Sequence, residues 1–500
     1  MFAGNVLWVY LVQQKNHNKD KHFCIFADYY NRRISLKVLH KPLKKVFAVA
    51  ALLCLLFWGK PFVSAQQADI VESTLARIAE HLSDFEFNEA MALFNTIPLP
   101  ERQSSYIRLL EASVLSSIGR FDEARAIAQA VNEAEPNNTE ALFLRAVIEG
   151  VQGRDRQQRD LLERLLEIEP DNVAARIALG NLHLSIRSLR DAAVHFRHVI
   201  TRDSENPEAL LGMARLLRIN QEWEDAEIFF NRVVTLHPNM VEARSERARF
   251  FRIRARLGEA LADMDVAKRL SPTDYWVAID RGSILLDMGR RAEALEEFMR
   301  AVAIDPDEFF AYVFTAGLKD ELGDLDGAEQ HFAILARLRP DYHYALEGLG
   351  LHKMRNERWT EARDIFLEAH RQAPSENHYA LLAAINWIRM GDRMGARNFL
   401  RQSITRITRD SLEWHMFRLF YDLTVNNFAG EINMLNRLSR ETDETLRARM
   451  TFYMALYYDI RGNVSMANRH FIMVNDMNRM AIPEWRLNRW ILASRGIETF

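Results

Sequence analysis

Cysteine is nearly absent from this chain of 500 residues. The two cysteines, Cys24 and Cys54, both lie within the first 65 residues. If that segment is removed from the mature protein, no thiol remains. Disulfide bonds, thiol catalysis and cysteine-ligated metals are then excluded.

Lysine is scarce beyond residue 65, where only Lys268, Lys319 and Lys353 occur. Residues 66–500 carry 55 Lys and Arg against 66 Asp and Glu, a net charge of −11. A protein of that charge lacks the excess of cations that neutralises nucleic-acid phosphates. We therefore predict no nucleic-acid partner.

Long apolar runs are missing as well, and the longest, Val46–Trp58, has only thirteen residues. As a helix it would span about 20 Å, short of the ~30 Å hydrocarbon core of a membrane. Lys44 and Lys45 precede the run, and the small residues of Val63–Ala65 follow it. This order is typical of a secretory signal.

The front of the chain is accordingly expected to be a signal peptide over residues 38–65, cleaved after Ala65. The mature protein would be periplasmic or secreted and would have no stable membrane span; the alternative is that the segment is kept as an anchor. Because residues 1–37 precede the signal, we expect them to be a spurious extension, with translation starting near Val38.

Repetition is the most prominent feature of the remaining chain. Prolines recur at intervals of 34 residues or twice 34, with Ser204 in the one missing place: Pro136, Pro170, Pro238, Pro272, Pro306, Pro340 and Pro374. Alanine stands twelve residues before each of these positions, with Gln158 as the exception. Alanine or glycine stands twenty-four residues before each of them. Eight residues before them stands a large apolar residue such as Phe298.

This pattern predicts two amphipathic helices per unit, neither of which can bury its apolar stripe alone. The small residues stand where two helix axes approach, and the phenylalanine fills the neighbouring gap. Gly119 and Gly289 are examples of glycines between the helices, where a turn needs φ > 0. Proline ends the second helix.

With this period and these residues, the chain resembles the tetratricopeptide repeat family. The resemblance implies an all-α fold, a right-handed α-solenoid of about twelve antiparallel helix hairpins. The expected divisions are an array over 66–410 (divergent in 71–104, nine regular repeats in 105–410), an irregular hairpin over 411–447, a terminal repeat over 448–481 and a capping helix over 482–500.

Catalytic motifs are absent, so we expect neither an enzyme nor a cofactor or metal. His195 and His198 lie three residues apart but lack further ligands at suitable spacing, which favours a solvated helix face. An enzyme site in the irregular hairpin remains an alternative through Glu413, His415 and Asp422.

The resemblance places a ligand groove on the first helix of each unit. Four arginines fall at groove positions of two successive units: Arg215, Arg218, Arg249 and Arg252. They could clamp an acidic peptide, carboxylate or phosphate through bidentate pairs. The alternative is that they pair with acids such as Glu208 and Glu242 and only keep the groove soluble.

Aromatic residues occupy one groove position in three consecutive units, Trp276, Phe310 and Tyr344. They could stack on a peptide or sugar, or pack between units. The resulting hypothesis is an exported scaffold or adaptor that binds protein partners through its groove, in the assembly of cell-envelope complexes. The alternative is a polysaccharide-binding subunit of an envelope or exopolysaccharide export system.

Overall fold

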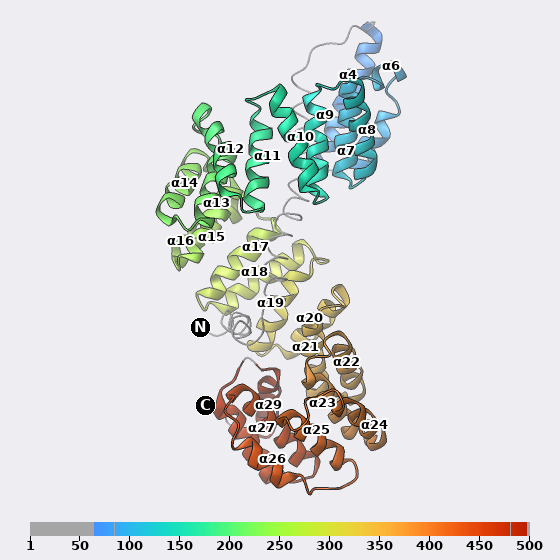
Figure 1. Ribbon diagram of the computed structural model, residues 1–500, viewed down its shortest axis with the longest axis vertical. Coiled ribbons are helices and arrows are strands. Elements are labelled where there is room, and N and C mark those ends of the chain that lie inside the picture. Colours follow the sequence, from blue (N-terminus) through green and yellow to red (C-terminus); the bar gives the residue numbers. More distant parts are fainter. Residues whose placement is uncertain (1–64, 85, 481, 498–500) are drawn as a thin grey trace. The chain divides into compact units, whose positions relative to one another are not determined.

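The computed structural model describes residues 65–497, apart from residues 85 and 481. All regular structure in this part of the chain is helical, and the helices follow one another as antiparallel pairs (Figure 1). The all-α repeat architecture expected from the sequence is thus confirmed. The predicted extension over 1–37 and signal peptide over 38–65 fall outside the described residues, except for Ala65, where the first helix begins.

Twelve hairpins and a terminal helix make up the described chain, with one short helix, α6, between the first two hairpins. The first six hairpins consist of α4 (Ala65–Ser83) and α5 (Phe87–Phe94), then, after α6 (Leu99–Arg102), α7 (Ser105–Ser117) and α8 (Phe121–Ala134), α9 (Thr139–Val151) and α10 (Asp155–Ile168), α11 (Val173–Ser185) and α12 (Leu189–Arg202), α13 (Pro207–Ile219) and α14 (Trp223–Leu236), α15 (Val241–Ile253) and α16 (Leu257–Leu270). The remaining six consist of α17 (Tyr275–Asp287) and α18 (Arg291–Ile304), α19 (Phe309–Glu321) and α20 (Leu325–Leu338), α21 (His343–Arg355) and α22 (Trp359–Gln372), α23 (Asn377–Arg389) and α24 (Arg393–Ile404), α25 (Leu412–Leu423) and α26 (Glu431–Leu438), α27 (Glu444–Ile460) and α28 (Val464–Met477), followed by α29 (Pro483–Ser494).

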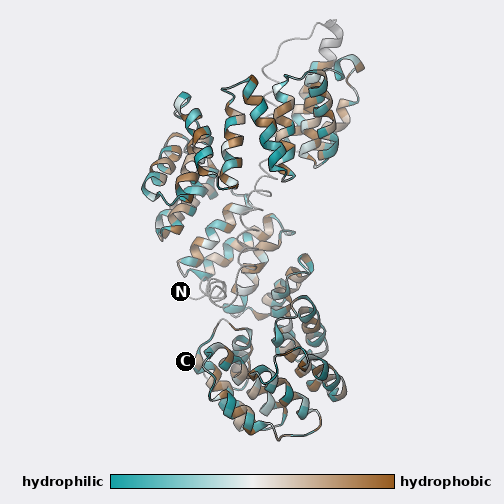
Figure 2. Cartoon of the chain, in the orientation of Figure 1, coloured by the Kyte–Doolittle hydropathy of each residue, from teal (hydrophilic) through white to brown (hydrophobic). Residues whose placement is uncertain are grey.

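Apolar and polar residues alternate along the helices, visible as brown turns between teal ones (Figure 2). Asparagine side chains begin several first helices, as where Asn138 Oδ1 accepts the Ala141 N–H at 2.9 Å and Asn172 Oδ1 accepts the Ala175 N–H at 3.0 Å. These caps satisfy backbone donors that the helix itself leaves unpaired.

The small residues of the repeat lie where the two helices of a hairpin meet, as their spacing predicts. Ala294 is 0% exposed, and a Cβ atom on Gly282 would lie 2.8 Å from the ring of Phe298. A side chain at Gly282 would therefore force the Phe298 ring to shift.

From the hairpin of α7 and α8 to that of α23 and α24, the turn between the two helices uses a left-handed residue at the same place in the repeat. Gly119 and Gly289 have φ of 86° and 76°, which glycine adopts without strain. Arg187 and Glu357 occupy the same place with φ of 60° and 56°. The turn geometry therefore belongs to the repeat and does not depend on glycine.

The structure forms two compact units that divide between Phe250 and Phe251, within α15. We refer to residues 65–250 as the N-terminal unit and to residues 251–497 as the C-terminal unit. The C-terminal unit has a continuous core that runs from Leu346 on α21 to Leu492 on α29.

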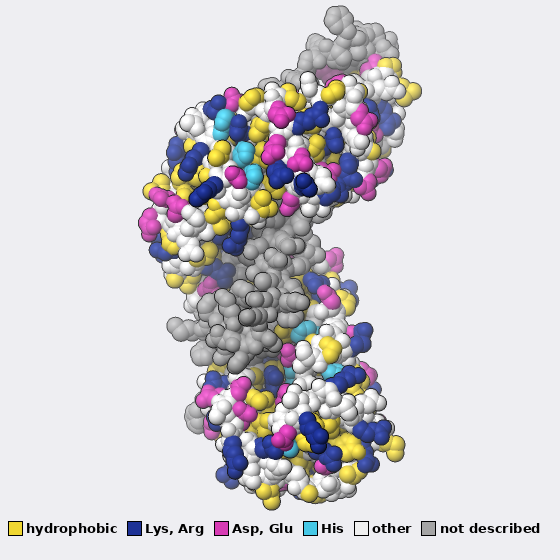
Figure 3. Space-filling view, in the orientation of Figure 1, with side chains coloured by type: hydrophobic (Ala, Val, Ile, Leu, Met, Phe, Trp, Pro, Cys, Tyr) yellow, Lys and Arg dark blue, Asp and Glu magenta, His cyan; other side chains and the backbone are white. Residues whose placement is uncertain are grey.

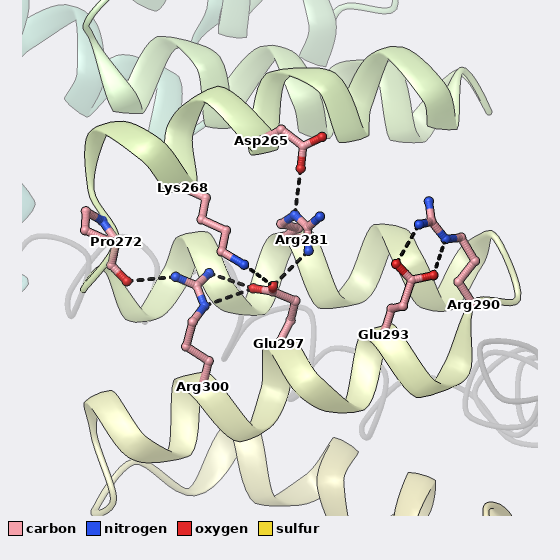
Figure 4. Close-up of polar contacts among 8 residues, drawn as sticks. All are labelled: Asp265, Lys268, Pro272, Arg281, Arg290, Glu293, Glu297 and Arg300. Atoms are coloured by element: carbon pink, nitrogen blue, oxygen red, sulfur yellow. Dashed lines mark hydrogen bonds and ion pairs between the residues drawn. The ribbon is translucent and has the colours of Figure 1, made fainter.

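Buried charges tie neighbouring helices together in the C-terminal unit (Figure 4). Glu297 on α18 is 4% exposed and receives Lys268 from α16 at 2.6 Å, Arg281 from α17 at 2.8 Å and Arg300 at 2.6 Å. Burial acts to raise the pKa of Glu297, but the hydrogen bonds from Lys268 and Arg300 outweigh burial and lower it. One carboxylate thus joins three successive helices.

In the hairpin of α25 and α26, Arg418 stands 34 residues after Ala384, at the place where the repeat has a small residue. The Arg418 side chain is 52% exposed and contacts Asp422 at 3.2 Å, so it points away from the position where a small residue would be buried. Its second helix, α26, has only eight residues and buries Met434 and Leu438. Among the described residues, no helix is both long and apolar enough to cross a membrane.

Candidate functional site

The first helices of successive hairpins lie closer to one another than the second helices do. In the N-terminal unit α7 contacts α9 and α11 contacts α13, and in the C-terminal unit α23 contacts α25 and α25 contacts α27. Helices that approach more closely lie on the inner side of a curved stack. We call the surface formed by the first helices of each unit its inner wall; it is the groove surface that the sequence predicts.

Three of the four predicted arginines gather on the inner wall of the N-terminal unit, around Glu246 of α15. Arg249 Nη1 lies 2.9 Å from the Glu246 carboxylate, and Arg215 and Arg218 from α13 lie 3.5 and 4.0 Å from it. Arg215 also contacts Glu242 at 2.5 Å. We call these five residues the Glu246 cluster; it has three cations and two anions.

Glu246 is 8% exposed, so its charge depends on these guanidinium groups. Burial acts to raise its pKa, but the charges of Arg215, Arg249 and Arg218 outweigh burial and lower it to about 2. Glu246 therefore remains ionised throughout the physiological range of pH.

Arg218 is the least satisfied member of the cluster. Its Nε is buried without a hydrogen-bond partner, and its one ion pair, with Glu246, is long at 4.0 Å. Burial lowers the pKa of Arg218, whereas Arg215 has its pKa raised because Glu246 and Glu242 outweigh its burial. Arg218 can therefore accept a further anion at lower cost than its neighbours.

The fourth predicted arginine, Arg252, does not join the cluster. It pairs with Asp287 of α17 at 2.5 Å in the C-terminal unit. The pairing of an arginine with Glu242 was one of the two alternatives that the sequence left open, whereas Glu246 was not identified from the sequence. The spacing of Glu246 and Arg249, three residues apart on one helix, was the signal that could have identified it.

The structure brings together two of the three predicted aromatic residues. The rings of Trp276 and Phe310 lie 6.1 Å apart, and Phe310, only 6% exposed, also packs edge-on against Phe314 at 5.2 Å. Tyr344 instead packs beside His343 of its own helix at 4.1 Å. Much of this aromatic surface is occupied by packing within the unit.

Part of the inner wall of the C-terminal unit is covered by α29. This helix contacts α27 and α28 of the last hairpin and also α21, and its Arg486 reaches Asp320 of α19 at 3.4 Å. α29 thus lies against the last hairpin and also reaches the first helices α19 and α21 of earlier hairpins.

Buried polar contacts hold α29 to the last hairpin. Glu484 is 0% exposed, accepts a hydrogen bond from the Tyr453 hydroxyl at 2.8 Å and pairs with Arg449 at 3.2 Å. Asn488, also 0% exposed, donates to the carbonyl of Phe471 at 3.0 Å. No repeat position predicts these contacts, because α29 lies outside the repeat.

A second buried carboxylate, Glu347 of α21, lies on the same wall. It accepts a hydrogen bond from Tyr379 at 2.9 Å and contacts His378 at 3.2 Å. Burial acts to raise the pKa of Glu347, but the hydrogen bond from His378 outweighs it and lowers that pKa. Burial acts to lower the pKa of His378, but the hydrogen bonds to Glu347 and Glu376 outweigh burial, and the pKa is raised overall.

The three residues of the enzyme alternative have separate partners. Glu413 accepts from Asn377 at 3.2 Å, His415 contacts Asp410 at 2.7 Å, and Asp422 pairs with Arg418. No contact between any two of the three is observed in the described chain, so this hairpin offers no shared catalytic arrangement.

The two histidines that we had placed on a solvated helix face differ in their surroundings. His195 stacks on His183 with ring centroids 5.5 Å apart, and burial lowers its pKa to about 4. His198 contacts Asp171 at 2.8 Å. Within the described residues, no three His, Cys, Asp or Glu side chains gather where they could hold a metal ion.

Charged side chains of both signs are interspersed over the visible face of the molecule (Figure 3). Opposite charges at short spacing pair with one another and leave little net field.

Comparison with known proteins agrees with the repeat pattern. One family model of the tetratricopeptide repeat matches residues 109–175, 177–241 and 318–377, and another matches residues 278–308. None of the curated proteins compared with the chain matches it.

Several solved structures are similar to parts of the chain. A tetratricopeptide repeat protein from Parabacteroides merdae is 17% identical over 49% of this chain and 96% of its own, with a TM-score of 0.41. PilW, a type IV pilus biogenesis factor, is 18% identical over 41% and 94%, with a TM-score of 0.37. YrrB, described as having an unusual peptide-binding site, is 21% identical over 38% and 95%, with a TM-score of 0.32.

Stacked antiparallel hairpins with small residues at their contacts define an α-solenoid repeat protein. The matches over residues 109–175, 177–241, 278–308 and 318–377 identify the repeat in these segments as the tetratricopeptide repeat.

Proposed function

We propose that this protein is a non-enzymatic adaptor that binds an acidic segment of a partner protein on the inner wall of its N-terminal unit. The Glu246 cluster carries the proposal. Three guanidinium groups face two carboxylates there, and Arg218 keeps an unused donor beside them. A partner carboxylate would pair with Arg218 and complete the cluster.

The background charge of the molecule supports this choice of partner. Residues 66–500 carry a net charge of −11, and the incompletely paired guanidinium of Arg218 lies on the inner wall of this acidic chain. Acidic segments would be repelled elsewhere and attracted there, which favours specificity over general adhesion.

The place of action is proposed from the sequence. A signal peptide over residues 38–65, cleaved after Ala65, would export the protein to the periplasm or beyond. An exported adaptor of this family would serve in the assembly of cell-envelope complexes. We favour a protein partner over a polysaccharide because Phe310, the central residue of the aromatic group, is only 6% exposed.

Site-specific photo-crosslinking in the cells that produce the full chain tests the proposal. A photoreactive residue replaces Asn181, an exposed inner-wall position on α11, or Val194, 60% exposed on the second helix α12 of the same hairpin. We expect protein adducts from position 181 and far fewer from position 194.

Charge reversal then tests whether the Glu246 cluster is responsible for the adducts formed from position 181. Arg218→Glu in the Asn181 crosslinking background should abolish the adducts, because it replaces the surplus cation with an anion. Arg232→Glu, on the second helix α14, is the matched control and should leave them unchanged. Equal adducts from both positions, or adducts that survive Arg218→Glu, would contradict the proposal.

A further inference from the structure

A small cavity lies in the C-terminal unit, at the edge where second helices end and first helices begin. It lies between the ends of α22 and α24 and the beginnings of α23 and α25 (Figure 1), and its volume is about 180 Å³. Because second helices and a connecting segment supply much of its lining, the cavity is distinct from the inner wall. It has room for about six water molecules, or for an organic molecule of about six to eight non-hydrogen atoms.

The cavity occurs where the chain departs from the regular repeat. Seven residues, Thr405–Ser411, connect α24 to α25, whereas the four residues 373–376 connect α22 to α23. The longer connection contributes Arg406, Ile407 and Thr408 to the lining of the cavity. These side chains therefore stand at positions that the regular repeat does not provide.

One cation and one anion line the cavity without pairing with each other. Arg406 and Glu413 both belong to the lining, but in the part of the chain that the structure describes neither has an ion-pair partner. Glu413 is held only by the Asn377 amide, which donates to its carboxylate at 3.2 Å. A simple anion in the cavity would be repelled by Glu413, and a simple cation by Arg406. A molecule that carries both charges satisfies both groups.

The remaining lining combines one polar atom with an apolar floor. Nδ1 of His370 is buried and has no hydrogen-bond partner within the described chain. Burial and the charge of Arg406 lower the pKa of His370, so its ring is neutral at neutral pH and keeps one accepting nitrogen. Ala380 and Phe417, each 1% exposed, form apolar surface beside it.

We propose that this cavity binds a small zwitterion, an α-amino acid with a short apolar side chain. The carboxylate of the ligand pairs with Arg406, and its ammonium group pairs with Glu413. Its side chain lies against Ala380 and Phe417. L-Valine, with about eight non-hydrogen atoms, corresponds to the volume of the cavity. Every group involved belongs to the C-terminal unit, so this binding and the capture of a partner by the Glu246 cluster can each be lost while the other is kept.

Isothermal titration calorimetry of the purified full chain with glycine, L-alanine, L-valine and L-leucine tests the proposal. We expect L-valine to bind at one site with a Kd below about 1 mM. Isovalerate lacks the amino group of valine and isobutylamine lacks its carboxylate, so each leaves one charge of the cavity unpaired. Both should bind at least about tenfold more weakly than L-valine. Absence of binding of all four amino acids, or isovalerate that binds as tightly as L-valine, would overturn the proposal.

Substitutions of the two charged residues assign the binding to this cavity. Arg406→Gln and Glu413→Gln should each weaken L-valine binding at least about tenfold. Glu413→Gln should also make isovalerate bind more tightly than it binds the unaltered chain, because the repulsion between two carboxylates is removed; a variant that was merely misfolded would not gain this affinity. Arg409→Gln, an exposed position on the same connection outside the cavity lining, is the matched control and should change neither affinity. Binding that persists unchanged in both Arg406→Gln and Glu413→Gln would overturn the proposal.

Hydrogen exchange then locates the ligand without any substitution. Saturating L-valine should slow amide exchange at least about fivefold in residues 405–417, because a bound ligand opposes local opening of the site that holds it. Exchange in α7 to α10 of the N-terminal unit should not change. Protection confined to the N-terminal unit would overturn the proposal.

Discussion

Single arginines on the inner wall differ in how fully they are paired, and the difference depends on residues from a neighbouring hairpin. Arg215 pairs with Glu242 and Glu246 of the next hairpin, and Arg252 pairs with Asp287 of the hairpin that follows its own. Arg218 alone has one distant partner. The two interpretations of these arginines, as a clamp or as paired groups, are therefore not exclusive.

Glu246 should make the stability of the N-terminal unit depend on acid. Its pKa falls from 4.5 to about 2 on folding, which corresponds to a contribution on the order of 3 kcal/mol. A carboxyl group with a lowered pKa stabilises the fold above its unfolded pKa. That contribution is lost as the pH falls from about 4.5 towards 2, where the folded form takes up its proton.

Glu246→Gln should consequently reduce the free energy of unfolding by about 3 kcal/mol at neutral pH and by progressively less below about pH 4.5. Denaturant unfolding monitored by hydrogen exchange in α13 and α15 measures, at each pH, the difference in the free energy of unfolding between the variant and the unaltered chain. Glu242→Gln is the control, because this side chain is 56% exposed and its loss should cost less than about 1 kcal/mol. A deficit for Glu246→Gln that persists unchanged at about pH 3 would refute the assignment.

Helices pair closely in this protein because small residues stand opposite aromatic rings. Gly348 of α21 and Gly317 of α19 are both inside first helices, but their surroundings differ. A Cβ atom on Gly348 would lie 2.4 Å from the ring of Phe332, whereas one on Gly317 would have no atom within 4 Å. The same residue type thus has a packing role at one position and none at the other.

Alanine substitution should separate these two roles. Gly348→Ala forces the Phe332 ring to move and should destabilise the C-terminal unit by about 1–3 kcal/mol. Gly317→Ala should stabilise it by about 0.5–1 kcal/mol, because alanine favours the helix and meets nothing. Thermal unfolding of the two variants and the unaltered chain gives the sign of each change in stability. A change in the same direction for both variants would contradict this account.

Across the whole molecule, most contacts join a helix to its immediate neighbours, as in other repeat proteins. α29 is an exception, because it reaches from the last hairpin to α21 and α19. The inner walls of the two units also differ in charge: the N-terminal wall has the Glu246 cluster, and the C-terminal wall is acidic beneath a basic helix.

Because each hairpin contacts mainly its neighbours, the destabilising effect of a substitution in one hairpin should decrease with distance along the array. Ala294 is 0% exposed at a helix contact, and Ala294→Trp should cost about 1–3 kcal/mol or more. Hydrogen exchange should accelerate most in α17 to α20 and least in α7 to α10. Met394→Trp, at a 76% exposed position, is the control and should change little. Equal acceleration throughout residues 65–497 would show global cooperativity instead.

The sequence alone determined the hairpins, their family and the turns between their helices. Ala294, Gly282 and Phe298 recur at fixed intervals, and a fixed interval encodes contacts between elements adjacent in the chain. Positions of the arginines on the first helices followed from the same interval.

Only the tertiary structure decided which charges meet and where α29 lies. Arg486 contacts Asp320 because the first helices of several hairpins curve past the terminal helix, and that curvature is a sum of small rotations between units. Similarly, Glu246 meets Arg218 through the spacing of α13 and α15 in space. The contact of Arg486 with Asp320 joins a residue outside the repeat to one inside it, so periodicity cannot reveal it.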